Sequence, residues 1–456
     1  MKFRSRSFIL LAAVALVFFA GASIYVNAQF GAVDLAGEVL AGERSAAEGI
    51  TVHERDVLYS RVEFSASYDA GSGETVSRGG ILPRTEPAQD DYPAGQMLRA
   101  KAAGLYGHAE WEGPEPDLSG LAPWAQDIFD DAVAGFDGGT GRFSGPVLLN
   151  AYTGTLTARL HDQSGLQLTN SDGGAEAALP LACDVWLDVT VELTESGGSM
   201  SFSPGEDLEY SACTSFTYAG DRAYFTLCLT GPEPGGSGTL DIYALDCDSS
   251  GYESDPDSYP LTADFSTLER LCSVEAEWES ALLGVDADGR LLLFTTCAGE
   301  LWLRVIDPAA GALTQCTYLS DEAGSGYSTF TALDGCVVLE WGHSLNAAAL
   351  NSAGMYEGVC AVDTASLPEP EGACAGSNAF LHFTREMCAW DGHRLAILDY
   401  GDWLPDHGMR YQYYSRLSVY EDGELVFCEW LPALLRQQPF AERALTLSAE
   451  PREVTP

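Results

Sequence analysis

One acid-rich stretch has the spacing of a calcium-binding loop. In "DCDSSGYESDPD", residues 246–257, oxygen-bearing side chains stand at positions one, three, five and twelve, and Gly251 stands at position six. The four side chains belong to Asp246, Asp248, Ser250 and Asp257. Ligands at this spacing wrap around Ca²⁺ in EF-hand-type loops, where the glycine permits the sharp bend. The stretch therefore predicts a Ca²⁺ site. A solvated acidic loop is the alternative, because Ser250 is a poorer ligand than Asp and Asp257 is shorter than the usual Glu.

A second group of side chains could recognise a sugar or a peptide. It combines aromatic rings, two histidines, an arginine and an acid in and beside segments 342–355 and 400–415. Its members are Trp341, His343, Trp403, Asp406, His407, Arg410, Tyr411 and Tyr413. Long loops on a rigid scaffold commonly carry such residues. If the two segments are equivalent connections of neighbouring units, these residues lie on one side of the protein. The alternative is that the rings only cap their own strands.

Four repeated units provide the elements that would position these residues. Each unit starts with an apolar run, a tight turn with a glycine and a second apolar run, and the glycines are Gly220, Gly289, Gly335 and Gly392. Three of the turns are Asp-Gly, which favours two-residue hairpins. A short apolar strand ending in an acid follows each hairpin, and these strands recur at a spacing of roughly 60 residues. Each unit thus predicts strands A, B and C and a turn into strand D.

A four-stranded unit that must stack on its neighbours resembles a blade of the β-propeller superfold. The resemblance covers about residues 206–430. "VIDPAAGAL", at 305–313, also resembles the strand and turn of quinoprotein-type blades, although Ala310 and Gln315 replace the threonine and tryptophan of that pattern. The resemblance implies an all-β fold of four-stranded antiparallel blades. At least four are clear, and residues 35–440 would hold about seven.

The N-terminal third is less regular. Strict alternation predicts strands at 62–68 and at 185–193, and Pro123 begins a stretch with helical apolar spacing. Residues 31–205 are therefore either degenerate blades or a separate small β domain. The expected division is a leader at 1–30, this β-rich region, propeller blades at 206–435 and a C-terminal tail at 436–456.

The leader predicts the compartment. Lys2, Arg4 and Arg6 precede an uncharged apolar stretch from Phe8 to Val26, so the rest of the chain should be exported. The stretch just reaches membrane-spanning length, while "VNA" at 26–28 would also serve as a cleavage site. The sequence thus predicts either a single-pass membrane protein with an extracytoplasmic C-terminal part or a secreted protein.

Charge restricts the partners. The formal net charge is −44, and such a surface repels nucleic acid and anionic lipid headgroups. The charge could simply keep the protein soluble, or it could attract cations or a cationic partner. We expect a protein or carbohydrate ligand at the cell surface, a membrane contact only through the leader, and no nucleic acid.

Twelve cysteines are spread along the chain without Cys-x-x-Cys spacing. Cys213 and Cys228 stand symmetrically about the turn at Gly220, which predicts a disulfide across that hairpin. The alternative is that the cysteines are buried thiols.

Motifs for catalysis are absent from the sequence. There is no Gly-x-Ser-x-Gly, no His-Glu-x-x-His and no glycine-rich phosphate loop. The sequence therefore favours a non-enzymatic binding or interaction module with no catalytic residue to name. The alternative is a propeller-fold hydrolase or lyase acting on glycans or lactones.

Overall fold

The computed structural model describes most of the chain and divides it into two compact units. The described residues are 13–22, 24–25, 35–58, 62–81, 99–103, 105–136, 139–161, 166–169, 175–205, 210–213, 215–231, 236–248, 261–321, 328–342, 344–369, 385–403, 412–432 and 441–449. Unit 1 comprises residues 1–90 and 319–456, and unit 2 comprises residues 91–318. These boundaries differ from the expected division, because both ends of the chain belong to one unit.

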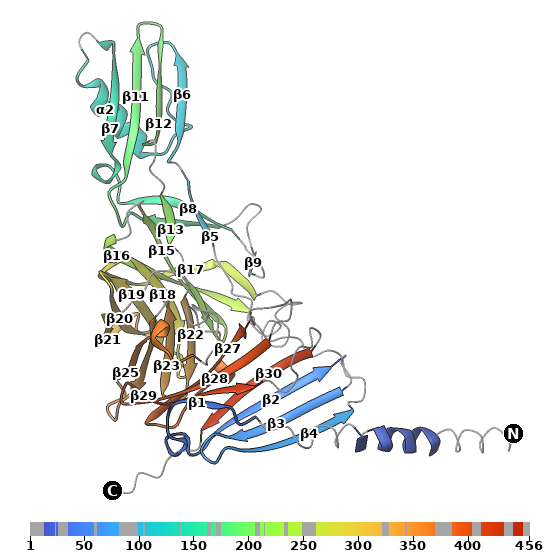
Figure 1. Ribbon diagram of the computed structural model, residues 1–456. Helices are drawn as coiled ribbons and strands as arrows, with labels where there is room; N and C mark the ends of the chain where they lie inside the picture. Colours follow the sequence, from blue (N-terminus) through green and yellow to red (C-terminus); the bar gives the residue numbers. More distant parts are fainter. Residues whose placement is uncertain are drawn as a thin grey trace, which may run out of the picture. The chain divides into compact units, whose positions relative to one another are not determined.

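Unit 1 is built from three antiparallel sheets (Figure 1), with the strand orders β22-β23-β24-β25, β1-β29-β28-β27-β26 and β30-β2-β3-β4. Its N-terminal strands are β1 (Glu38–Gly42), β2 (Ile50–Leu58), β3 (Val62–Asp69) and β4 (Glu74–Ile81). The later strands are β22 (Ser328–Leu333), β23 (Cys336–Trp341), β24 (Ser344–Leu350), β25 (Tyr356–Asp363), β26 (Cys388–Trp390), β27 (Arg394–Trp403), β28 (Gln412–Glu421), β29 (Glu424–Pro432) and β30 (Ala441–Ala449). Three short 3-10 helices, η1 (Arg44–Ala47), η4 (Thr364–Ser366) and η5 (Arg385–Met387), connect them.

Strands from the two ends of the chain share sheets in unit 1. β1 pairs with β29, and β30 pairs with β2 along its whole length, from Ile50 opposite Ala449 to Leu58 opposite Ala441. The prediction that 436–456 is a tail is therefore wrong for residues 441–449. A core that includes Ile50, Phe64, Tyr68 and Phe427 lies between these sheets.

Unit 2 contains the other sheets. Its strands up to residue 204 are β5 (Arg99–Ala103), β6 (Gly107–Glu112), β7 (Gly141–Leu148), β8 (Thr155–His161), β9 (Leu166–Thr169), β10 (Ala175–Pro180), β11 (Trp186–Thr194) and β12 (Gly197–Pro204). Helices α2 (Trp124–Val133) and η3 (Leu149–Ala151) lie among them. The later strands are β13 (Ser211–Cys213), β14 (Phe216–Ala219), β15 (Arg222–Thr230), β16 (Gly236–Asp248), β17 (Leu261–Trp278), β18 (Ser280–Val285), β19 (Leu291–Cys297), β20 (Glu300–Asp307) and β21 (Ala312–Ser320).

Two kinds of sheet occur in unit 2. The sheets β18-β19-β20-β21 and β14-β15-β16-β17 follow the chain order, and β13 and β9 extend the second. The sheet β6-β12-β11-β7 does not follow the chain order, because its strands come from two segments, 107–148 and 186–204, which β8, β9 and β10 separate in the sequence. We call β6, α2, β7, β11 and β12 the insert.

The four predicted hairpins are confirmed as β14-β15, β18-β19, β22-β23 and β26-β27. All four turn glycines have positive φ, from +57° at Gly220 to +100° at Gly392. That conformation suits glycine because it has no Cβ. In the third unit, however, "GVCAVD" is strand D (β25) and not strand C as expected. Strand C is β24, whose small side chains are buried up to Ala349.

The described part of the N-terminal leader includes helical residues at 13–22. Among the described residues of the chain, no helix has both the length and the apolar character needed to cross a membrane.

Buried ion pairs fasten the sheets of unit 1. Arg394 and Asp391 are 1% and 0% exposed and lie 2.7 Å apart, and the same guanidinium donates to the carbonyl oxygens of Ala46 and Glu48. Burial alone would raise the pKa of Asp391. Hydrogen bonds from the backbone N–H groups of Arg394 and His393 and from the Arg394 side chain outweigh burial, so that this pKa lies below its usual value.

This arrangement predicts a pH-dependent contribution to stability. Because the pKa is lower in the folded than in the unfolded state, the stabilisation is complete at neutral pH and is lost as pH falls through the folded value. Asp391→Asn should cost about 1–2 kcal/mol at pH 7. The deficit should shrink below about pH 4, the ordinary pKa of an aspartate. Urea unfolding of both proteins at pH 7 and pH 3 measures this, and a deficit that is constant with pH would contradict it.

Candidate functional site

The insert has one covered and one uncovered face. On β11, Leu187, Val189 and Val191 are buried against α2, whose Ile128 and Phe129 lie in the same core. The alternation predicted at 185–193 and the helix predicted from Pro123 are thus confirmed. Figure 1 shows α2 beside β7 and β11. The opposite face consists of the even-numbered residues of β6, β7 and β11 and the odd-numbered residues of β12, and we call it the open face.

Strand register arranges the side chains of the open face in rows. Glu110, Ser199, Glu192 and Arg142 lie directly opposite one another across the four strands. The next row is His108, Ser201, Thr190 and Ser144, in which the last two hydroxyl groups lie 3.1 Å apart. The His108 Nε2 and Glu110 Oε1 atoms lie 3.3 Å apart, and the two side chains are 62% and 74% exposed, so the described residues leave both open to water.

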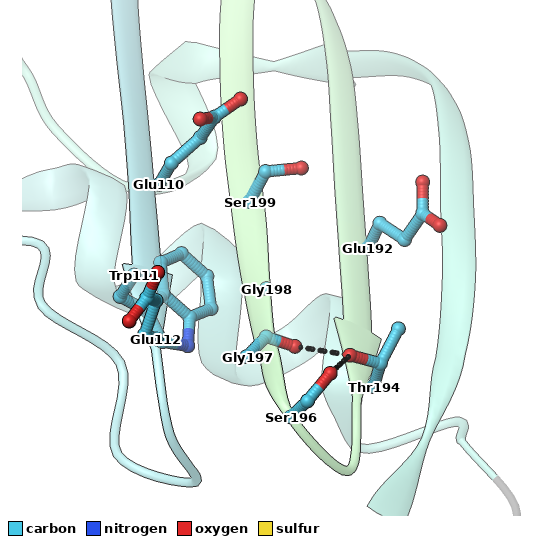
Figure 2. A pocket seen from close by; sticks show the side chains of 9 residues that line it. All are labelled: Glu110, Trp111, Glu112, Glu192, Thr194, Ser196, Gly197, Gly198 and Ser199. Atoms are coloured by element: carbon cyan, nitrogen blue, oxygen red, sulfur yellow. Dashed lines mark hydrogen bonds between the residues drawn. The ribbon is translucent and has the colours of Figure 1, made fainter.

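A hollow of about 520 Å³ lies where β6, β11 and β12 meet. Figure 2 shows Glu110 and Glu192 on either side of Ser199, with Glu112 and Thr194 in the adjacent row. Thr194 Oγ1 lies 3.3 Å from Ser196 Oγ and donates to the Gly197 carbonyl at 2.8 Å, which fixes the β11-β12 turn. The hollow is lined by Glu110, Trp111, Glu112, Glu192, Thr194, Ser196, Gly197, Gly198 and Ser199.

Two glycines are required beside this hollow. Gly197 has φ +151°, and a Cβ there would lie 2.2 Å from the Trp111 carbonyl oxygen. A Cβ at Gly198 would lie 2.5 Å from Cζ2 of the Trp111 indole. Trp111 is 8% exposed and packs edge-on against Phe129, with ring centroids 5.6 Å apart. The glycines therefore let β12 lie close to β6 and to the indole below it.

Carboxylates outnumber cations on the open face. Its acids are Glu110, Glu112, Asp188 and Glu192, and its one arginine is Arg142. Hydroxyl groups fill much of the remaining area, and Trp186, 43% exposed, lies at one end. Such a face can accept hydrogen bonds and attract positive charge. Among the residues that the structure describes, no three His, Cys, Asp or Glu side chains are grouped to hold a metal ion.

The sheets outside the insert identify the fold. The repeated hairpin units form antiparallel sheets whose strands follow one another in order, and terminal strands complete sheets of the opposite end. The chain has a β-propeller-type fold. The four predicted units each form a four-stranded antiparallel blade, the sheet β10-β8-β5 has three strands among the described residues, and the insert is an additional sheet covered by a helix.

Comparisons with known proteins add no function. No family model matches the chain, and no curated protein matches it. Solved structures similar to it include the β-propeller domain of the Trilobed protease from Pyrococcus furiosus, at 12% identity and TM-score 0.22 over 60% of this chain and 67% of that one. A quinonprotein alcohol dehydrogenase-like protein from Bacteroides thetaiotaomicron is 11% identical, with TM-score 0.21 over 87% and 91%. The WD40 domain of SCAP from fission yeast is 9% identical, with TM-score 0.22 over 64% and 71%.

Three of the eight residues of the predicted aromatic surface, Trp341, Trp403 and Tyr413, belong to strands. Trp341 ends β23 and is 2% exposed, so it cannot stack on a ligand from the surface. The long connection expected after it is wrong, because residues 344–350 form β24. Trp403 and Tyr413 belong to β27 and β28, which pair as far as Trp403 opposite Gln412. His343, Asp406, His407, Arg410 and Tyr411 lie outside the described residues, and their ligand-binding role stays a prediction.

The start of the expected calcium loop is also a strand. Asp246 and Asp248 end β16, opposite Asp264 and Thr262 of β17. A loop that curves around an ion from Asp246 is therefore wrong for these residues, because the β16-β17 ladder keeps them extended. Ser250 and Asp257 lie outside the described residues, and Ca²⁺ binding stays a prediction.

Strand register supports the geometry expected for the cysteine pair. Cys213 on β13 lies directly opposite Cys228 on β15. Directly opposed positions on antiparallel strands are within the Cα separation that a disulfide needs. The bond itself stays a prediction. Elsewhere burial raises the pKa of the thiols, to about 12 for Cys360, so such a cysteine stays a neutral thiol at physiological pH.

Sequence reasoning missed the open face of the insert, although a signal was present. In 186–194 the residues between the apolar positions include Asp188, Thr190, Glu192 and Thr194, which is the polar side of a half-buried strand. "GHAEWE" at 107–112 alternates in the same way. Pairing these two polar stripes across β12 requires the register, which the sequence does not contain.

Proposed function

We propose that this protein is an extracytoplasmic binding module that recognises a cationic partner through the open face of the insert. The leader would retain it at the membrane or, if cleaved, release it. The observation that carries the proposal is a helix-backed sheet whose uncovered face has four carboxylates and one arginine, with three of the carboxylates, Glu110, Glu112 and Glu192, lining a hollow. Charges on such a face increase the rate and the specificity of association with an oppositely charged partner.

The arrangement in the hollow favours binding over catalysis. Glu110 and Glu192 belong to strands that flank β12, so their backbones are about 10 Å apart. The Glu110 side chain is 74% exposed, whereas catalytic acids are usually shielded from water. Both carboxylates are therefore placed to form separate contacts with a large partner.

A fluorescein-labelled hexalysine peptide tests the proposal. Fluorescence anisotropy with the full chain at 50 mM NaCl should show saturable binding that weakens at 150 mM, because salt screens exposed charges. Glu110→Gln/Glu192→Gln should weaken binding about 2- to 30-fold, the range for two exposed ion pairs. Their side chains already reach water, so the folded protein should keep its melting temperature.

A matched control separates the open face from the general acidity of the chain. Glu38→Gln/Glu275→Gln removes the same charge from exposed positions on β1 and β17, two strands that belong to other sheets. This control should bind hexalysine like the parent protein. If both double variants lose affinity equally, or if the parent protein does not bind, the proposed function is wrong.

A further inference from the structure

The carboxylates of the open face are spaced along the strands and not gathered at one point. Glu110 and Glu112 are two residues apart on β6, which corresponds to about 7 Å along the strand. Asp188 and Glu192 are four residues apart on β11, which corresponds to about 14 Å. A single Ca²⁺ ion needs its oxygen ligands at about 2.3–2.6 Å, so carboxylates on this spacing do not converge on one ion.

The same spacing occurs in an extended polypeptide. Side chains on one side of an extended chain recur every second residue, at about 7 Å. A basic segment lying along β6 and β11 would therefore bring alternate lysines or arginines to Glu110 and Glu112, or every fourth residue to Asp188 and Glu192. Its other side chains would point away from the sheet.

The rest of the open face suits such a segment. Ser199 and Ser201 lie on β12 between the two acidic strands, and Thr190 lies beside Ser201 on β11; all three hydroxyl groups can accept hydrogen bonds from ammonium or guanidinium groups. Trp186 is 43% exposed at one end of β11 and offers a ring face to a cation. The side chains of this face reach solvent, and α2 packs against the other face of the sheet. Binding would therefore require little ordering of the sheet backbone.

We propose that the partner is a polypeptide with an extended basic segment, read by the match between its alternate cationic side chains and the carboxylates of the open face. This inference rests on the proposed function and makes it specific. Charge complementarity supplies the attraction, and the common two-residue repeat supplies the selectivity.

Two peptides of equal composition test the inference. Labelled Lys-Ser-Lys-Ser-Lys-Ser-Lys and Lys-Lys-Lys-Lys-Ser-Ser-Ser carry the same charge, but only the first presents all four lysines on one side when extended. Along β6 both peptides can place two lysines, two residues apart, on Glu110 and Glu112. Along β11 only the alternating peptide can place lysines four residues apart on Asp188 and Glu192, so the full chain should bind it up to about 5-fold more tightly, the range for one exposed ion pair. Glu110→Gln/Glu112→Gln should weaken the binding of both peptides alike, whereas Asp188→Asn/Glu192→Gln should remove most of this preference. Glu38→Gln/Glu275→Gln should not.

A gain of function provides a second readout. The variant Glu110→Lys/Glu112→Lys/Asp188→Lys/Glu192→Lys should bind the alternating peptide Glu-Ser-Glu-Ser-Glu-Ser-Glu, which the parent protein repels. Equal affinity for alternating and block lysine peptides, or tighter binding of spermine than of the alternating peptide, would overturn the inference and leave the proposed function intact. Failure of every cationic probe would overturn both.

Discussion

Glu429→Ala is expected to destabilise unit 1 by about 3 kcal/mol, at the lower end of the range for breaking a buried ion pair. Glu429 on β29 is fully buried, and its Oε1 accepts hydrogen bonds from Arg44 Nη2 at 2.6 Å and from the Gly37 N–H at 3.0 Å. Its Oε2 accepts from Arg44 Nη1 at 3.0 Å and from the Tyr68 hydroxyl at 2.6 Å. Alanine would remove the acceptor of all four hydrogen bonds, although Arg44 Nη1 could still donate to the Ala70 carbonyl oxygen and the Tyr68 hydroxyl. The Arg44 side chain is 27% exposed, so water can compensate part of the loss.

Thermal unfolding followed by circular dichroism should show the loss as a melting temperature lower by about 6–12 °C. Glu63→Ala is the matched control, because Glu63 pairs with Arg55 at 2.8 Å on the surface, with side chains 24% and 46% exposed. Such a pair contributes less than about 1 kcal/mol. If the two alanine variants melt alike, Glu429 does not fasten unit 1 in the way described.

Trp111→Ala is expected to cost about 3–5 kcal/mol in the insert, the usual loss for a large buried aromatic side chain. The indole lies between Gly198 and Phe129. Gly197 and Gly198 have no side chains, so they cannot fill the cavity that removal of the indole would create. Hydrogen exchange of the amides in β6, β11 and β12 should therefore accelerate. Hexalysine binding should weaken as the protection of these amides against exchange falls.

Trp186→Ala provides the comparison, because this tryptophan is on the open face of the same sheet and is 43% exposed. Its removal should change stability by no more than about half a kcal/mol. If Trp111→Ala leaves exchange in β6 and β12 unchanged, the indole does not support the open face.

Local turn chemistry explains which blades could be predicted. The Asp-Gly turns at Gly289, Gly335 and Gly392 need positive φ, a requirement that a dipeptide alone reveals. β24 was missed because "SLNAAAL" has weak β propensity and forms a strand only because its neighbours bury it. The stronger strand pattern of "GVCAVD" instead predicts that segment as strand C.

The open face could not be predicted, for a different reason. Its Glu110 and Glu192 belong to segments far apart in the sequence, and β12 joins them only through cross-strand register. The sequence predicts each polar stripe as the solvent-facing side of a strand, but the local sequence does not indicate which strand lies beside it. At Asp246 and Asp248 the local spacing predicts a loop, whereas pairing with β17 makes both residues part of a strand; Ca²⁺ binding itself stays a prediction.

Pairing of β1 with β29 and of β30 with β2 sets the order in which a growing chain can fold. Residues 35–81 are synthesised early, and β2 can pair with β3 at once, but β1 and the other edge of β2 have no partner until residues 424–449 have followed. Unit 2 is continuous in sequence and can complete its sheets much earlier. During synthesis β1 and that edge of β2 are therefore open to proteases and to non-native pairing for most of translation, and unit 1 is the last to complete its sheets.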